Sequence, residues 1–191
     1  MRRRHTQRLR SLAALVAAAG AAGLASAGPA QSAVIVTASG TKVRIAHDPG
    51  GTDSIYIYQS GANLVVSTTP NGPAVSGGSV PLASVKKILI DLRRSGDYPV
   101  LRADLVNGPE IQWSLMGRKG NDPVFFEGVV CRRLQMRFGG GYDTFHLGAV
   151  AISESSTFDG GANSDRFLQA STPAIEGAEV EILGFEVMDF D

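Results

Sequence analysis

The chain has 191 residues, with 18 basic and 18 acidic side chains. Residues 1–27 carry five arginines and no acid, so the chain from Gly28 onward has 13 basic and 18 acidic residues and a net charge of −5. This acidic balance argues against a nucleic-acid partner, which would need a basic patch. The single cysteine, Cys131, excludes an internal disulfide, and the length suits one domain.

Residues 1–27 have the order of a secretory signal peptide. A basic segment is followed by an apolar, alanine-rich run from Leu12 to Ala25 and by the A-x-A cleavage site Ala25-Ser26-Ala27. The apolar run is shorter than the roughly 20 residues that a membrane-spanning helix needs. We therefore expect cleavage, with no stable membrane insertion of the mature chain, although an uncleaved anchor is the alternative. The predicted location is the periplasm, the cell surface or the extracellular space.

Residues 28–80 are expected to form an irregular group of β-strands within the same domain as the rest of the mature chain. Apolar residues alternate in segments 43–45, 55–58 and 63–66, and turn residues separate these runs. Tyr56 and Tyr58 share one face of their strand. That face is either an exposed aromatic patch or packed under a loop predicted for 68–78. We expect this region to cap one end of the fold.

A repeat of about 22 residues runs through the predicted repeat region, residues 81–191. Each unit has an alternating apolar run and then a glycine-containing turn that ends in aspartate. The aspartates are spaced by 25, 21 and 22 residues. Apolar residues recur seven residues before and two residues after them, and also nine residues before them, where Ser156 is the exception. The aspartates are Asp97, Asp122, Asp143 and Asp165.

This period predicts an all-β fold, a right-handed parallel β-solenoid with coils of about 22 residues. One coil cannot bury its apolar face alone, but coils stacked about 4.8 Å apart share a core. A β-sandwich of short strands is the alternative. The run 180–187 is expected to form the last strand or strands, with its acids protecting the exposed edge. The positions between the apolar ones should face solvent: Asp91, Gln112, Ser114, Gln135 and Arg137.

Three turns resemble the calcium-binding nonapeptide repeats of RTX (hemolysin-type) proteins, G-G-x-G-x-D-x-U-x with U apolar. Residues 160–168 match except for asparagine at the fourth position, 138–146 match except at the first, and 117–125 lack the second glycine. The resemblance implies a β-helix or β-roll with calcium in turns between adjacent coils. Here each motif stands alone rather than in consecutive pairs. Only one side of the solenoid could therefore resemble the family's calcium-binding side.

Stacked coils would align the four aspartates in one column, where like charges repel and raise each other's pKa. Calcium is one compensator, because it takes about six to eight oxygens from carboxylates and carbonyls. The best candidate metal ligands are Asp143 and Asp165, followed by Asp122 and Asp97. The alternative is an Asx turn, in which each carboxylate accepts a hydrogen bond from the backbone N–H two residues on. Basic residues in the same turns, such as Arg118, could also neutralise the column.

The remaining reactive residue types form no catalytic constellation in the sequence. His47 and His146 are expected on the surface, Trp113 and Cys131 in the core, and there is no G-x-S-x-G motif. We expect an exported, non-enzymatic β-solenoid with a structural or surface-interaction role, stabilised by calcium and by no other cofactor. Its partner would be a cell-surface polysaccharide or protein.

Two other functions stay open at this point. The first is a carbohydrate-binding or polysaccharide-cleaving β-helix, which acids and aromatics clustered along one solenoid face would favour. The second is a module separated from a larger secreted protein, with no activity of its own. Fold analogy alone does not decide among these functions.

Overall fold

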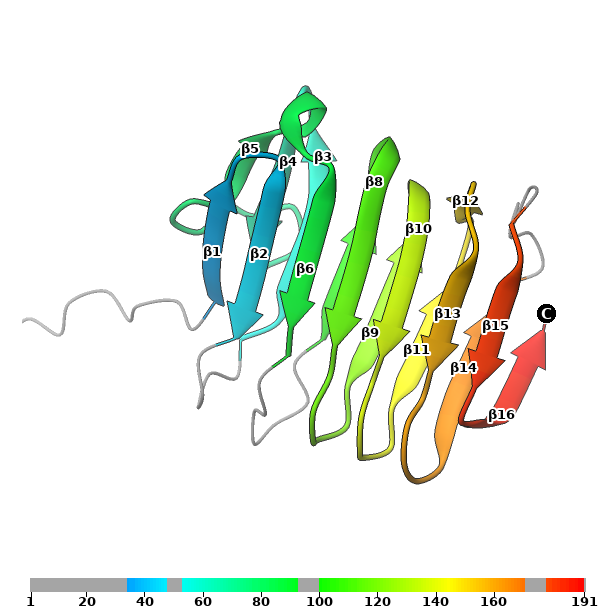
Figure 1. The fold of residues 1–191 in the computed structure, drawn as a ribbon. Helices are drawn as coiled ribbons and strands as arrows, with labels where there is room; N and C mark the ends of the chain where they lie inside the picture. The colour runs from blue at the N-terminus through cyan, green and yellow to red at the C-terminus, as the bar shows by residue number, and fades with distance from the viewer. Residues whose placement is uncertain (1–33, 48–52, 93–99, 171–177, 191) are drawn as a thin grey trace, which may run out of the picture. The chain divides into compact units, whose positions relative to one another are not determined.

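Two eight-stranded β-sheets face each other in the unit that spans residues 32–191 (Figure 1). The computed structural model describes residues 34–47, 53–92, 100–170 and 178–190. Sheet A has the order β1 (Val34–Ser39), β2 (Lys42–His47), β6 (Lys87–Asp91), β8 (Asn107–Met116), β10 (Val130–Arg137), β13 (Ser156–Asp159) and β15 (Val180–Leu183), with β12 (Ala151–Ile152) paired to β10. Sheet B has the order β16 (Phe185–Phe190), β14 (Asp165–Gln169), β11 (Thr144–Leu147), β9 (Pro123–Glu127), β7 (Leu101–Asp104), β3 (Ile55–Ser60), β4 (Asn63–Ser67) and β5 (Ser79–Pro81).

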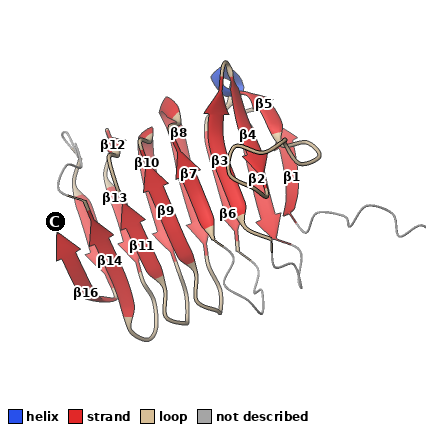
Figure 2. Ribbon diagram, turned by 180° about the vertical axis from the view of Figure 1, so that it is seen from behind, coloured by secondary structure: helices blue, strands red, loops and turns tan. Residues whose placement is uncertain are grey.

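The chain passes from sheet A to sheet B and back once per coil. The strand pairs β6–β7, β8–β9, β10–β11 and β13–β14 form successive coils, and their neighbours within each sheet pair in parallel (Figures 1 and 2). This parallel stacking confirms the predicted β-solenoid over the β-sandwich. The parallel stack also includes β2 and β3, which pair with β6 and β7. The parallel stack therefore begins before residue 81, inside the region that we expected to form β-strands and a cap.

Antiparallel strands close the N-terminal end of both sheets. β1 pairs antiparallel with β2 in sheet A, while β4 and β5 extend sheet B from β3 in the same way. A single 3₁₀ turn, η1 (Leu82–Ser84), then leads into β6. The hydroxyl of Tyr58 donates a hydrogen bond to the carbonyl oxygen of Gly72, so this ring lies against the loop that follows β4. The C-terminal strands β15 and β16 occupy the predicted run.

The register of the strands explains the uneven spacing of the repeat. Gly108 aligns with Cys131 and Gln112 aligns with Arg133, so β8 contains two more residues than β10 over this stretch. The extra residues form a bulge at the start of β8 and lengthen the coil that the 25-residue spacing marks. Outside such bulges the register repeats coil after coil. Each inward position therefore meets its equivalent in the next coil.

Aromatic side chains fill the space between the sheets. Trp113, Phe126, Phe138, Phe145, Phe158 and Phe167 are all less than 2% exposed. The ring centroid of Phe145 lies 5.0 Å from that of Phe158 and 5.5 Å from that of Phe138. The exception in the repeat, Ser156, is buried too, and its Oγ accepts a hydrogen bond from the backbone N–H of Leu134 in the preceding coil. The five residues predicted to face solvent are all outside the core.

Replacing Phe145 with alanine is expected to lower the free energy of unfolding by about 3 to 5 kcal/mol, because the neighbouring rings cannot close the resulting cavity. Urea unfolding of the chain from Gly28 measures this loss. Thr157→Ala is the matched control on the outer face of sheet A and is expected to change stability by less than about 0.5 kcal/mol. Equal losses in both variants would contradict a core that runs through this coil.

Candidate functional site

The turns that connect sheet A to sheet B stack on one another and form what we call the turn column, residues 117–122, 138–143 and 160–165 (Figure 1). Lys119 bridges in parallel to Gly140, which bridges in turn to Ala162. The backbone N–H of Gly120 donates to the carbonyl oxygen of Gly140 at 3.0 Å. The turns thus continue the parallel ladder of the sheets around the corner of the solenoid.

A left-handed backbone recurs two residues before each described aspartate of the column. The φ angles are +121° at Gly120, +147° at Gly141 and +87° at Asn163. Glycine adopts such angles without a steric penalty, and asparagine is among the residues that tolerate them best. The asparagine that departs from the nonapeptide pattern therefore takes the backbone conformation that the glycines take in the other two turns.

The three described aspartates form a hydrogen-bonded ladder along the turn column. Asp122, Asp143 and Asp165 are 6%, 1% and 0% exposed. Oδ1 of Asp143 accepts a hydrogen bond from the backbone N–H of Asp122 at 2.7 Å, and Oδ1 of Asp165 accepts one from that of Asp143 at 2.8 Å. These bonds join neighbouring coils, whereas the Asx-turn alternative placed them within one turn. The fourth candidate, Asp97, lies outside the described residues.

An Asx turn does form beside this column, at a residue that sequence reasoning did not single out. Oδ1 of Asp159 accepts a hydrogen bond from the backbone N–H of Gly161 at 3.1 Å. Asp159 lies six residues before Asp165 and ends β13, so it shapes the entry into the turn. The hydrogen bonds between coils are instead made by the buried carboxylates of Asp143 and Asp165.

The second carboxylate oxygen of each buried aspartate has no hydrogen-bond partner. Glycines make room for two of these Oδ2 atoms. A methyl group at Gly117 would lie 2.9 Å from Oδ2 of Asp122 and 2.0 Å from the carbonyl oxygen of Phe138, in the next coil. At Gly160 it would lie 2.8 Å from Oδ2 of Asp165 and 2.7 Å from the carbonyl oxygen of Gly184. At each of these two glycines, the Oδ2 of an aspartate and a carbonyl oxygen of the next coil therefore border the space beside the glycine α-carbon. The Oδ2 accepts no hydrogen bond there.

Burial makes the ionised form of these carboxylates unfavourable. Desolvation, with a smaller effect of the Asp143 charge, raises the pKa of Asp122 from 3.8 to about 7. Desolvation also raises the pKa of Asp143 from 3.8 to about 6, although the hydrogen bond from Asp122 opposes this shift. The pKa of Asp165 is raised by the same cause. Near neutral pH the column therefore favours a proton or a cation beside its unpartnered oxygens.

The atoms that could ligate a metal here are chemically suited to calcium, the cation that the RTX resemblance implies. All of them are carboxylate or carbonyl oxygens, which a hard divalent cation prefers. Within the described residues, no three His, Cys, Asp or Glu side chains converge on one point. A calcium ion here would therefore depend on Oδ2 of one or two aspartates together with turn carbonyls.

The other candidate residues lie apart from the turn column. His47 was expected on the surface but is 1% exposed, because it continues the inward positions Val43 and Ile45 of β2; its Nε2 lies 2.5 Å from the carbonyl oxygen of Asp53. His146 lies on the outer face of sheet B, as expected. Cys131 is buried, and burial raises the pKa of its thiol to about 12, which disfavours the nucleophilic thiolate.

An aromatic row that sequence reasoning missed lies on the outer face of sheet B. Tyr56, Arg102, Phe125, His146 and Leu168 are register partners on five neighbouring strands. The rings of Phe125 and His146 lie 5.7 Å apart. Phe125 and His146 each lie three residues after a column aspartate, Asp122 and Asp143. The repeat in the sequence therefore already contained the spacing that places these two rings side by side.

Carboxylates accompany this row on the same face. Asp104 and Glu127 are register partners in β7 and β9, two residues further along each strand. Both oxygens of Asp104 accept hydrogen bonds from Nε of Arg102, at 2.7 and 2.9 Å. The carboxylate and its hydrogen bond hold the pKa of Arg102 above its usual value. This face therefore combines neighbouring rings with oriented polar groups.

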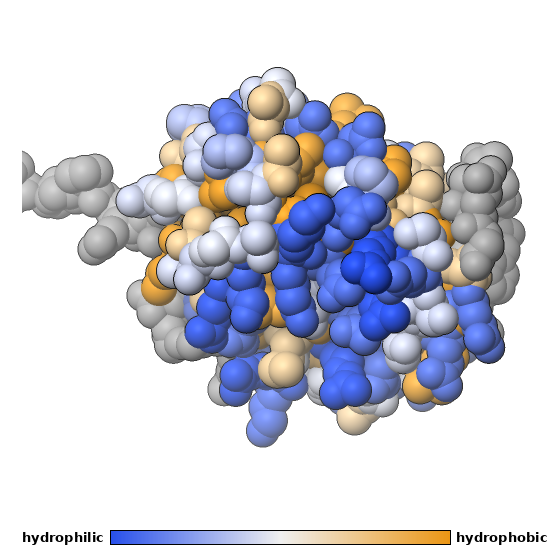
Figure 3. All heavy atoms as spheres, turned by 45° about the horizontal axis from the view of Figure 1, so that its top comes forward, coloured by the Kyte–Doolittle hydropathy of each residue, from blue (hydrophilic) through white to orange (hydrophobic). Residues whose placement is uncertain are grey.

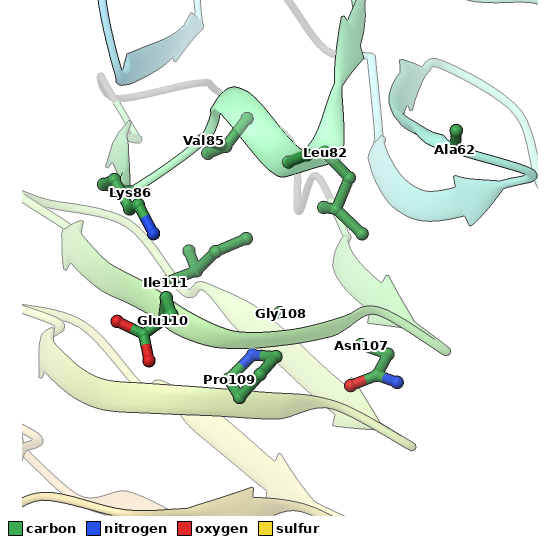
Figure 4. A pocket seen from close by; sticks show the side chains of 10 residues that line it. Ala62, Leu82, Val85, Lys86, Asn107, Gly108, Pro109, Glu110 and Ile111 are labelled. Atoms are coloured by element: carbon green, nitrogen blue, oxygen red, sulfur yellow. The ribbon is translucent and has the colours of Figure 1, made fainter.

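A pocket of about 340 Å³ opens at the other end of the strands, between η1 and the bulged start of β8 (Figure 4). Its walls are mostly apolar and include Leu82, Val85 and Ile111. Lys86 and Glu110 lie at the same end of the pocket. The pocket is thus an apolar recess beside Lys86, which directly precedes β6.

Comparison with known proteins finds no matching family model and no significantly similar curated protein or solved structure. Among the residues that the structure describes, no helix is long and apolar enough to cross a membrane.

Proposed function

We propose that this chain is an exported, non-enzymatic β-solenoid with a structural or surface-interaction role, stabilised by calcium at its turn column. One observation carries the proposal: Asp143 and Asp165 each use one oxygen to join two coils, and the Oδ2 atoms of both, like that of Asp122, are buried without a partner. Buried carboxylates without compensation cost several kcal/mol. A cation that compensates them would stabilise the stacked coils, and a stable stack presents two flat outer faces to a partner.

Export makes calcium a suitable compensator for these sites. The signal segment predicted for residues 1–27 would deliver the chain to a compartment where calcium sites with millimolar dissociation constants are used. Each site offers few oxygens, so a weak affinity is expected. Such sites would fill outside the cytosol.

Calcium is expected to raise the melting temperature of the chain from Gly28 relative to excess chelator. At calcium a hundredfold above Kd, a ligand that binds only the folded state adds about 2.7 kcal/mol, or about 5 to 10 °C for a domain of this size. Scanning calorimetry at pH 8 measures the shift. Asp143→Asn should reduce it, whereas Asp159→Asn, directly before the third turn of the column and with a partnered Oδ1, should not. An unchanged melting temperature at millimolar calcium would refute calcium binding at the turn column. Protonation would then be the remaining way to neutralise the buried aspartates.

The aromatic row favours carbohydrate binding as a second candidate function. Exposed rings stack on the apolar faces of sugars, and neighbouring carboxylates such as Asp104 and Glu127 accept hydrogen bonds from sugar hydroxyls. Retention of the chain on insoluble neutral glycans tests this function, with Phe125→Ala as the test variant and Leu89→Ala on sheet A as the control. Equal retention of both variants would count against the row as a binding surface.

A further inference from the structure

Three basic side chains and one amide form a row across the outer face of sheet A, which we call the basic row: Lys42, Lys87, Gln112 and Arg133. Lys42 is the register partner of Lys87, Lys87 of Gln112, and Gln112 of Arg133, on β2, β6, β8 and β10. Adjacent strands lie about 4.8 Å apart, so the two lysines directly face each other across one strand spacing. Like charges in this arrangement destabilise a sheet.

Two acids on this face, Asp91 and Glu154, are paired with arginines rather than with the lysines. Asp91 already accepts from Arg44 at 3.2 Å and from Arg118 at 3.3 Å. Glu154 is likewise shared by two arginines, Arg132 and Arg133. Within the part of the chain that the structure describes, Lys42, Lys86 and Lys87 take part in no ion pair. The face therefore keeps a local excess of positive charge.

This excess stands out because the rest of the mature chain is acidic. From Gly28 onward the net charge is −5. Yet seven of the 13 basic residues belong to β2, β6 and β10 or directly precede β6: Lys42, Arg44, Lys86, Lys87, Arg132, Arg133 and Arg137. Hydrophilic side chains dominate this side of the molecule in Figure 3. A charge separation of this kind steers a partner of opposite charge to one face.

We propose that the basic row binds an acidic polysaccharide chain that runs across the strands, along the solenoid axis. This inference rests on the surface-interaction role proposed above and names the partner. Lys42 and Lys87 offer two cations about one strand spacing, about 4.8 Å, apart, which is close to the length of one sugar in an extended glycan. Gln112 provides an amide that can donate to and accept from sugar hydroxyls. The pocket beside Lys86 offers Pro109 and Ile111 to the apolar face of a sugar ring (Figure 4).

The composition of the face favours a glycan over single-stranded nucleic acid. Proteins that bind single strands combine basic grooves with aromatic rings on which bases stack. The outward positions of the described sheet A strands carry no aromatic ring, since Trp113 and Phe158 both point into the core.

Binding of polygalacturonate to the chain from Gly28 tests the proposal, with dextran as the neutral polysaccharide. We expect binding to polygalacturonate but not to dextran, with an affinity that falls as salt rises. Lys42→Gln/Lys87→Gln should weaken binding by about tenfold, the effect of roughly 1.4 kcal/mol. Lys119→Gln/Arg166→Gln removes the same charge from the turn column and sheet B and should retain affinity within about twofold.

Several results would overturn the proposal. These are equal weakening by both double variants, no binding to polygalacturonate, and equal or tighter binding to single-stranded DNA or to vesicles with anionic lipids. Unchanged melting temperatures of the variants in calcium would show that a loss of binding is not a loss of folding. The calcium shift of the wild-type chain is measured separately. If the chain keeps this calcium shift but binds no acidic glycan, the proposed polysaccharide partner is refuted. The proposed calcium-stabilised solenoid is not.

Discussion

In chelator at pH 8, replacing Asp143 with asparagine is expected to raise the free energy of unfolding by roughly 2 to 3 kcal/mol, because the pKa of this buried carboxyl is raised from 3.8 to about 6. The asparagine Oδ1 can still accept the hydrogen bond from the backbone N–H of Asp122. The uncompensated charge is removed, so the ladder is kept without its main cost. With calcium present the same variant should lose part of the stabilisation that the metal provides.

Urea unfolding in calcium and in chelator measures this reversal. Asp143→Ala is the second variant, because it removes both the charge and the acceptor and leaves the N–H of Asp122 buried without a partner. It should be less stable than Asp143→Asn by about 1 to 3 kcal/mol. If asparagine destabilises the chain in chelator as much as alanine does, the ionised carboxylate is itself stabilising and our account of the column is wrong.

The stability of the metal-free chain should fall as pH rises from about 4 to about 7. The folded pKa values of Asp122 and Asp143, about 7 and about 6, lie above the ordinary 3.8. In this window the folded state binds more protons than the unfolded state, so each rise in pH favours unfolding. Above the folded values both states are ionised and this contribution becomes constant. Asp143→Asn should flatten the profile, and a stability that increases across the window in chelator would contradict the raised pKa values.

Replacing Gly141 with alanine is expected to destabilise the chain by more than about 4 kcal/mol, the range that backbone strain and overlap reach together. Its φ is +147°, and a β-carbon there would lie 1.9 Å from the carbonyl oxygen of Gly120 and 2.6 Å from its carbonyl carbon. Both atoms belong to the backbone of the neighbouring turn, so no side chain can move aside. The turn column would have to open at this coil.

Gly140 provides the matched control one residue earlier. A β-carbon there would have no heavy atom nearer than the carbonyl oxygen of Arg118, at 4.0 Å. Gly140→Ala is therefore expected to change the free energy of unfolding by less than about 1 kcal/mol. Circular dichroism during thermal unfolding compares the two variants. Equal melting temperatures would mean that the turns do not stack as closely as the structure shows.

The amino-acid sequence by itself determined the class of fold and the inward face of each coil. Alternation of apolar residues is a local property, and its recurrence every 21 to 25 residues requires stacked coils to bury the apolar positions. The burial of Trp113, Cys131 and the aromatic residues near the column aspartates follows from that pattern alone. The last strands and the alignment of Asp122, Asp143 and Asp165 follow from the same spacing.

The tertiary structure alone decided what the polar residues do. Whether an aspartate bonds within its own turn or to the next coil depends on the close approach of two turns, which no single repeat specifies. His47 follows the inward alternation of Val43 and Ile45, but only the folded chain brings its Nε2 to the carbonyl oxygen of Asp53. The basic row joins β2 to β6, whose paired lysines stand 45 residues apart in the sequence, across the inserted strands β4 and β5. Such sites arise from strand register, and register is set by which strands become neighbours when the core closes.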